Sequence, residues 1–161
     1  MSVESVRNYL KEYGLEDRVQ EFEVSSATVE LAAAALECEP CRIAKTLSFL
    51  VEEQPILIVV AGDAKVQNGK YKQHFHCKAK MMDPQTTLER IGHPVGGVCP
   101  FAVKEDVQVF LDVSLKRFDW VYPACGSGNS AVGLTPEELE KASQALAWVD
   151  VCTIMEETAA P

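Results

Sequence analysis

A single lysine stands inside one of the most apolar stretches of the sequence. Lys45 lies between Ile43 and Leu47, in a run whose residue types are typical of a buried strand. Because a buried ammonium without a partner is costly, Lys45 must either reach solvent at the end of a strand or face a polar cavity. The sequence leaves both interpretations open, and in the second the lysine is a cation available to a ligand.

Two short segments are rich enough in glycine to aim backbone N–H groups at one point. They are residues 96–100 (GGVCP) and residues 126–130 (GSGNS). Glycine allows a loop to turn several N–H groups toward one anion or carbonyl oxygen, the arrangement that stabilises an oxyanion. Each segment taken alone is equally compatible with an ordinary turn.

The six cysteines permit redox or metal chemistry. Cys38 and Cys41 have the spacing of a redox dithiol or of half a zinc site. The pair follows a predicted helix and precedes a predicted strand, the reverse of the order that activates a redox thiol. The remaining candidate ligands, which are His74, His76, Cys77 and Cys99, lack the paired spacing of a zinc site. We therefore interpret Cys38 and Cys41 as turn residues and expect reduced thiols, no metal and no cofactor.

A nucleophilic triad can also be assembled by residue type. Cys99, His93 and Asp112 would supply a thiol, a base and a carboxylate. Their spacing does not indicate that they converge in space, and a cysteine flanked by glycines is often a small buried residue. A cysteine hydrolase is therefore a minor alternative.

Charge is distributed unevenly along the chain. The formal net charge of -9 argues against a surface built as a whole to bind nucleic acid. Residues 61–80 are the exception, because they carry Asp63 against a basic cluster of five lysines. These are Lys65, Lys70, Lys72, Lys78 and Lys80. The cluster is either a binding site for a polyanion or a solvated loop or edge strand in which lysines discourage aggregation.

These residues have to be positioned by one domain. A length of 161 residues is the usual size of a single compact domain, and a hydrophobic content of 47% excludes disorder. No apolar run approaches the roughly 18–20 residues that span a bilayer. Acidic residues occupy the start of the chain, where a targeting peptide would be basic. We predict one domain over residues 1–161, in the cytoplasm and without a membrane partner.

Hydrophobic periodicity and end signals predict the elements of the first half. A helix is expected over residues 2–13, a strand over 18–24, and a second helix that begins at the cap Thr28 and ends before Pro40. Residues 41–51 and 54–63 are expected to form a hairpin with its turn at Glu52–Glu53.

The second half alternates less regularly. Residues 66–82 stay unassigned, Asp83 begins a helix that ends at Gly92, and strands are expected over 107–115 and 120–125. Thr135 and Pro136 begin a helix that runs to about Trp148, and the tail, residues 153–161, is expected to be loose at its end. Because regular βαβ alternation is absent, we predict a mixed α/β fold with a curved, barrel-like mixed sheet surrounded by helices.

The ordered set of motifs resembles a known family. Residues 25–49, 92–101, 112–115 and 125–139 carry SSATVELAAAALECEPCRIAKTLSF, GHPVGGVCPF, DVSL and CGSGNSAVGLTPEEL. In this order and spacing they are similar to the YbaK/EbsC family, which includes the editing domain inserted in bacterial prolyl-tRNA synthetase and its free-standing relatives. The resemblance spans about residues 3–150 and implies the predicted fold.

The resemblance also implies roles for individual residues. Lys45 matches the lysine of the family's I-x-K-T-L strand, beside the tRNA end, and Gly96, Gly97 and Pro100 match the G-x-x-x-P loop whose amides face the scissile carbonyl. By the same resemblance the substrate would contact Ser26, Thr28, Cys99, Phe101, Gly126, Ser127 and Asn129. The match is less close at the last three, because GSGNSAV lacks the charged residue of many relatives.

The implied activity is hydrolysis, in trans, of the ester that joins a wrong amino acid to tRNA, with tRNA(Pro) carrying Cys or Ala as the expected substrate. Water, or the substrate's own thiol or 2'-hydroxyl, would attack while the protein stabilises the oxyanion. The partners would be the aminoacylated 3' end of tRNA, held by the basic cluster, and a synthetase. The alternative is a non-catalytic module of the same fold that binds an amino-acid derivative or a synthetase.

Overall fold

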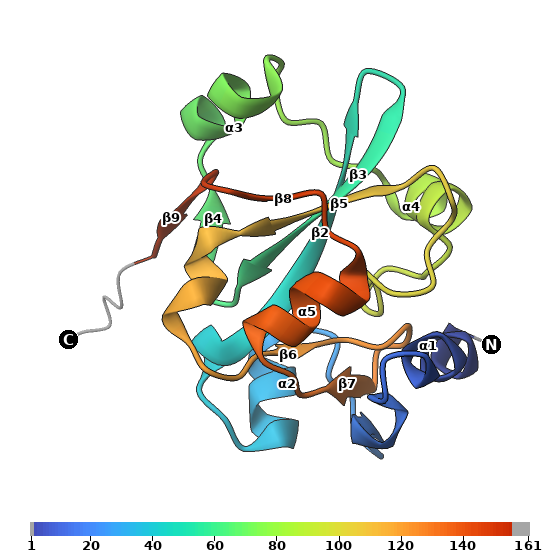
Figure 1. Ribbon diagram of the computed structural model, residues 1–161. Helices are drawn as coiled ribbons and strands as arrows, with labels where there is room; N and C mark the ends of the chain where they lie inside the picture. Colours follow the sequence, from blue (N-terminus) through green and yellow to red (C-terminus); the bar gives the residue numbers. More distant parts are fainter. Residues whose placement is uncertain (1, 156–161) are drawn as a thin grey trace.

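The computed structural model describes residues 2–155 and has a curved mixed sheet at its centre (Figure 1). Its five strands lie in the order β6-β2-β3-β5-β8. They are β2 (Ile43–Val51), β3 (Gln54–Ala61), β5 (Gln108–Asp112), β6 (Tyr122–Pro123) and β8 (Ala147–Val149). Two further pairs are β1 (Val19–Glu21) with β7 (Ser130–Val132) and β4 (Ala64–Val66) with β9 (Cys152–Ile154). The predicted mixed α/β fold with a curved sheet is confirmed.

The hairpin of β2 and β3 contains the two longest strands of this sheet, and the other strands pair outward from it. Its strands are antiparallel from Ala44 opposite Ala61 to Val51 opposite Gln54, so the turn falls at Glu52–Glu53 as predicted. β6 joins β2 in parallel, and β5 joins β3 in parallel. Every residue of β3 after the first is buried, which explains its continuous apolar sequence.

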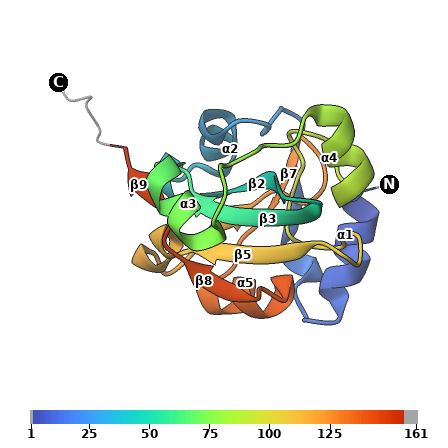
Figure 2. The same ribbon diagram turned by 90° about the horizontal axis from the view of Figure 1, so that it is seen from above.

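Five α-helices among the described residues surround the sheet. They are α1 (Ser2–Lys11), α2 (Val29–Leu36), α3 (Asn68–Phe75), α4 (Pro84–Ile91) and α5 (Pro136–Ser143). Figure 2 shows α2 and α4 on the β2 side of the sheet and α5 on the β8 side. None of the helices within residues 2–155 has the length and apolar character needed to cross a membrane.

Side-chain caps begin three of these helices where the sequence predicts them. The Thr28 hydroxyl accepts from the Leu31 amide at 3.1 Å, and the Asp83 carboxylate accepts from the Thr86 amide at 2.7 Å. Thr135 forms a capping box with Glu138. These local hydrogen bonds satisfy amides that the helix itself leaves free, which is why such starts can be read from sequence.

The predicted end of the last helix is wrong. α5 ends at Ser143, because Gln144 adopts a left-handed conformation with φ of 56°. Ala147 and Trp148, which the prediction placed in this helix, belong with Val149 to the edge strand β8 beside β5. Pairing with an exposed sheet edge outweighs the helical propensity of this segment.

Other expected elements differ as well. The first helix ends at Lys11 and not at residue 13, and the strand expected over 18–24 is β1 alone. α3 lies in the unassigned segment, where its residue pattern is hidden because Tyr71 is its one buried side chain. The strand predicted over 107–115 ends at Asp112, whose carboxylate accepts from the Ser114 amide at 2.9 Å and starts a 3-10 helix, Val113–Arg117. Of the strand predicted over 120–125, only the two residues of β6 form a strand. The end of the tail, residues 156–161, lies outside the described residues.

Candidate functional site

A pocket of about 460 Å³ opens beside β2. It is lined by residues 26–29 before and in α2, residues 43–48 of β2, and residues from segments 81–87, 95–98 and 122–131. Most of the lining is apolar, and hydroxyl groups of serine and threonine supply much of the rest. Among the described lining residues Lys45 is the single charged side chain. The pocket therefore combines an apolar wall with one cation.

The register of the hairpin places Lys45 near the start of β2, directly after the two residues that pair with β6. It lies opposite Val60 of β3 and is half-buried, and its ammonium has no ion-pair or hydrogen-bond partner within the part of the chain that the structure describes. Burial lowers the pKa of its ammonium below the ordinary value of 10.5, and Cys152, Asp63 and Glu30 oppose this shift. The sequence left two interpretations of Lys45 open. The structure favours the second, because Lys45 lines a cavity.

The glycine loop, residues 94–98, forms one rim of the pocket. Gly96 has a φ of 96°, a conformation that favours glycine. The N–H of Gly97 donates to the Pro94 carbonyl at 2.9 Å and is engaged in a turn. The N–H groups of Gly96 and Val98, both pocket-lining residues, have no hydrogen-bond partner among residues 2–155. The Val95 amide, also of a pocket-lining residue, lacks a partner there as well, so the loop leaves three donors free, among them those of Gly96 and Val98.

The two glycine-rich segments meet backbone to backbone. The N–H of Gly126 donates to the Gly97 carbonyl at 2.9 Å. A Cβ on Gly97 would lie 2.4 Å from the Ser127 nitrogen, so only glycine permits this approach. The N–H of Ser26 donates to the Gly128 carbonyl at 2.7 Å and attaches a third segment.

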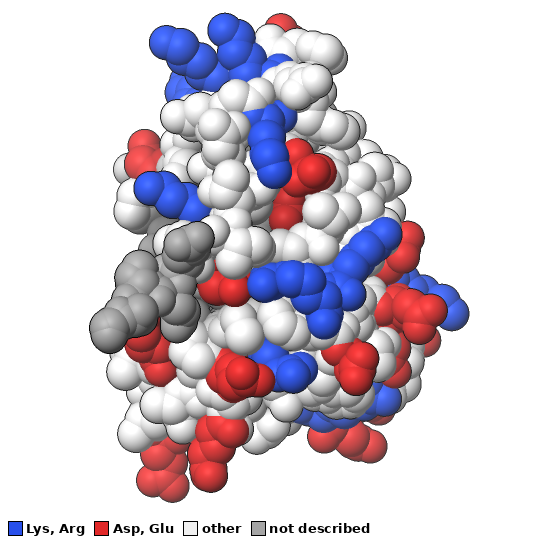
Figure 3. All heavy atoms as spheres, turned by 90° about the vertical axis from the view of Figure 1, so that its left-hand side faces the viewer, with Lys and Arg blue, Asp and Glu red and all other residues white. Residues whose placement is uncertain are grey.

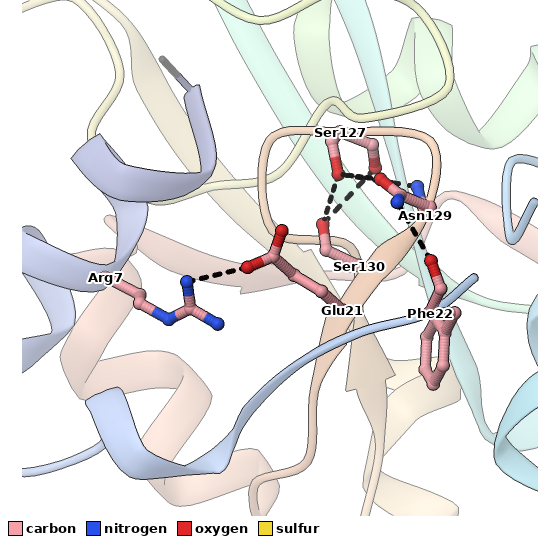
Figure 4. Close-up of polar contacts among 6 residues, drawn as sticks. All are labelled: Arg7, Glu21, Phe22, Ser127, Asn129 and Ser130. Carbon is pink, nitrogen blue, oxygen red and sulfur yellow. Dashed lines mark hydrogen bonds and ion pairs between the residues drawn. The ribbon is translucent and has the colours of Figure 1, made fainter.

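Ser127 and Asn129 stabilise the second loop from within. The Ser127 hydroxyl oxygen lies 2.8 Å from both Asn129 Oδ1 and Ser130 Oγ, as Figure 4 shows. Asn129 Nδ2 donates to the Phe22 carbonyl at 3.0 Å and so anchors the loop to the segment after β1. Beside this network an ion pair joins Arg7 of α1 to Glu21 of β1 at 2.8 Å.

The structure gathers four of the predicted site residues at the pocket and leaves the others outside its lining. The four are Ser26, Thr28, Lys45 and Gly96. The others are Gly97, Cys99, Pro100, Phe101, Gly126, Ser127 and Asn129. Of these, Cys99 and Phe101 are fully buried in the hydrophobic core, and Gly97, Gly126, Ser127 and Asn129 build the loops.

Some lining residues were not foreseen from the sequence. The hydroxyl groups of Ser48 in β2 and Thr87 in α4 lie 3.2 Å apart and connect the two walls of the pocket. Val98 contributes a free amide, but the sequence signal pointed to its glycine neighbours. Polar residues at buried positions of predicted elements were the available signal for Ser48 and Thr87.

The triad of Cys99, His93 and Asp112 does not form. Cys99 Sγ does lie 3.6 Å from His93 Nε2, but burial raises the pKa of the Cys99 thiol to about 12 and the side chain is inaccessible. The Asp112 carboxylate instead accepts from the amides of Ser114 and Val151, each at 2.9 Å. A protonated, buried thiol is not a nucleophile, so this alternative is wrong.

Cys38 and Cys41 are free thiols whose pKa values are raised by burial. They lie at the end of α2 and in the turn that precedes β2, as the turn interpretation expects. The residues from 2 to 155 contain no group of three or more His, Cys, Asp or Glu side chains that could hold a metal ion.

The basic cluster lies on and around α3. Figure 3 shows lysine and arginine side chains at the top of one face, where α3 lies in Figure 1, and acidic side chains at the bottom. Lys70 is engaged, because its ammonium contacts Asp150 at 3.1 Å and the Cys152 carbonyl at 2.8 Å. The other four lysines of the cluster are exposed. Lys80 is followed directly by Met81 in the pocket lining, so the cluster extends to the pocket.

Fold and site together define the class of this protein. It is a mixed α/β domain with a pocket that is lined by one lysine and bordered by the glycine loop, which a second glycine-rich loop contacts. The chain belongs to the aminoacyl-tRNA editing domain family, whose model matches residues 23–142. The resemblance to the YbaK/EbsC family is thereby confirmed.

Known relatives agree with this assignment. The chain is 54% identical over 153 residues to the uncharacterized protein YwhH of Bacillus subtilis (strain 168), covering 94% of this chain and 98% of that protein. It is 29% identical over 114 residues to the proline--tRNA ligase of Geobacillus sp. (strain WCH70), covering 68% of this chain but 20% of the ligase. A solved structure described as a candidate trans-editing enzyme for prolyl tRNA synthetase superposes with a TM-score of 0.85. It shares 27% identity, with 94% of this chain and 97% of that chain covered.

The contact between the glycine loops can be tested by stability. Gly97→Ala forces its Cβ against the Ser127 backbone, so the free energy of unfolding should fall by about 1–3 kcal/mol, the usual cost of overpacking. Gly128→Ala is the matched control, because its Cβ would meet only the Ala27 methyl group at 3.5 Å. We expect a change within about 1 kcal/mol for the control. Urea denaturation measures both, and equal stabilities of the two variants would contradict the contact.

Proposed function

We propose that this protein is a trans-editing aminoacyl-tRNA deacylase, which hydrolyses the ester between a wrong amino acid and its tRNA. The observation that carries the proposal is Lys45, a cation without an ion-pair partner among the described residues and the one charged side chain of the pocket lining. Membership of the editing-domain family and similarity to proline--tRNA ligases support tRNA(Pro) as the tRNA, and we propose Cys or Ala as the amino acid removed.

The pocket lining supports a small uncharged amino acid as the group removed. Among the described lining residues there is no carboxylate, so a lysyl or arginyl side chain would be desolvated without a partner. Apolar wall residues such as Val29, Leu47 and Ala131 suit a short aliphatic or thiol side chain. Exclusion by an unpaired charge discriminates more strongly than the loss of one methylene contact.

The chemistry requires donors for a developing oxyanion and a cation near the tRNA end. The free amides of Gly96 and Val98 are the donors, and Lys45 provides the cation for the terminal phosphate. Water, or the substrate's own thiol or 2'-hydroxyl, attacks the ester carbon and forms a tetrahedral oxyanion. The bond from that carbon to the ribose oxygen then breaks, and the attacking group's proton is transferred to this oxygen. With water as the attacking group, the products are free amino acid and uncharged tRNA. Attack by the substrate's own thiol releases the tRNA and leaves a cyclic thioester, and attack by the 2'-hydroxyl moves the ester to that oxygen, so in both cases a water molecule must then cleave the new bond to complete hydrolysis.

Removing the Lys45 charge tests this function. Lys45→Met retains most of the aliphatic stem and lacks the ammonium, so we expect deacylation of Cys-tRNA(Pro) or Ala-tRNA(Pro) to fall about 100-fold or more. The folded state should persist, because the lost charge is one that burial disfavours. Release of labelled amino acid, with circular dichroism as a folding check, measures both effects.

Lys141→Met is the matched control. Lys141 lies in α5, is exposed and is outside the pocket lining, so wild-type rates are expected. Normal deacylation by Lys45→Met would refute the role of the ammonium. A folded wild-type protein that hydrolyses no ester in a panel of mischarged tRNAs would instead support the non-catalytic binding module.

The basic cluster should act on tRNA affinity and not on chemistry. The double variant Lys78→Gln and Lys80→Gln removes two exposed cations on the segment that leads to the pocket. We expect KM to rise, kcat to stay within about twofold, and the slope of log affinity against log salt to decrease by about 2. An unchanged salt slope would show that tRNA binds elsewhere.

A further inference from the structure

His93 is a buried histidine at the base of the glycine loop, outside the pocket lining. It is 1% exposed, and its Nε2 lies 2.7 Å from the carbonyl oxygen of Phe101. Residues 93 and 101 stand at the two ends of the segment that carries Gly96 and Val98. The hydrogen bond therefore closes the loop across its base.

The contacts of the imidazole determine its tautomer. A carbonyl oxygen only accepts, so Nε2 carries the proton and donates it to Phe101. Nδ1 has no hydrogen-bond partner among the described residues. Burial lowers the pKa of His93 below its ordinary value of 6.5, in agreement with a neutral ring.

Cys99 takes part in the same closure. Its thiol lies 3.7 Å from the Phe101 carbonyl and 3.6 Å from His93 Nε2, so two donors converge on one oxygen. On the other side of the loop, the Gly97 carbonyl is held by the Gly126 amide. The segment from 94 to 98 is thus fixed at its base by a side chain and near its tip by a backbone contact.

We propose that His93 is a positioning residue for deacylation: its Nε2–H holds the Phe101 carbonyl so that the amides of Gly96 and Val98 keep the geometry of an oxyanion site. This inference rests on the proposed function. It assigns the pair of His93 and Cys99 to loop geometry and not to nucleophilic attack. A shift of about 1 Å in such donors can cost about 100-fold in rate without changing the remote contacts that bind substrate.

The test compares two substitutions of similar size. His93→Leu removes the donor, and we expect kcat to fall about 10- to 100-fold with KM within about twofold of wild type. His93→Gln replaces Nε2–H by an amide donor of similar reach and should recover most of kcat. If the role of His93 were only structural, both variants would lose stability, and the variant with a donor, His93→Gln, would have no higher kcat than His93→Leu. If His93→Leu does not fold, His93→Asn, whose amide is too short to reach Phe101, takes its place.

Hydrogen exchange separates failure of this inference from failure of the proposed function. Without any substrate, the Gly97 and Gly126 amides should exchange faster in His93→Leu than in wild type and near the wild-type rate in His93→Gln. An active wild type with full kcat in His93→Leu would overturn the positioning role and leave the deacylase intact. If the wild type is inactive and His93→Leu exchanges at the wild-type rate, both the positioning role and the deacylase function are overturned. If the wild type is inactive but exchange depends on the donor at position 93, only the deacylase function is overturned.

Discussion

The hydrogen bond from the Gly126 amide to the Gly97 carbonyl is the contact on which the pocket depends. It joins two loops that lie about thirty residues apart, and it exists because residue 97 has no Cβ. The second loop in turn receives the Ser26 amide at the Gly128 carbonyl, which brings the segment before α2 to the same rim. Backbone groups thus hold each other in place and leave the amides of Gly96 and Val98 free.

The second constraint is electrostatic. The chain carries a net charge of -9, yet the pocket lining among the described residues contains one cation and no anion. Among carboxylates, Asp63 has the largest electrostatic effect on the pKa of Lys45. Both oxygens of the Asp63 carboxylate are bound by Arg117 in an ion pair. The Lys45 ammonium therefore has no carboxylate bound to it among the described residues, and burial lowers its pKa. An unpaired cation in an apolar wall is the feature on which the proposed contact with the tRNA phosphate rests.

The sequence predicted features that depend on local chemistry. The caps Thr28, Asp83 and Thr135, and the turn at Glu52–Glu53, each depend on neighbouring residues and were placed correctly. Features that depend on distant partners were not. β8 needs the edge of β5, and α3 shows one buried side chain, so neither has a local signal.

The same division applies to the site. Lys45 and the glycine segments were identified by residue type, and the family resemblance supplied their roles. The contact of Gly97 with Ser127 and the pairing of Ser48 with Thr87 join segments far apart in the chain, and no spacing rule reports them. Cys99 and His93 are in contact although their spacing did not indicate it, and burial of the Cys99 thiol, which raises its pKa, removes the nucleophile that their types suggested.

In the proposed function, the Gly96 and Val98 amides and the Lys45 ammonium face the carbonyl and the terminal phosphate of an aminoacylated tRNA end. A stable analogue of that end, with the ester replaced by an amide and a 5'-phosphate on the terminal adenosine, allows a direct test by NMR titration. We expect saturable shifts of the Gly96 and Val98 N–H signals and of the Lys45 ammonium, with Lys141 unaffected. Saturation of the protein with the analogue while these three groups stay unchanged would contradict it.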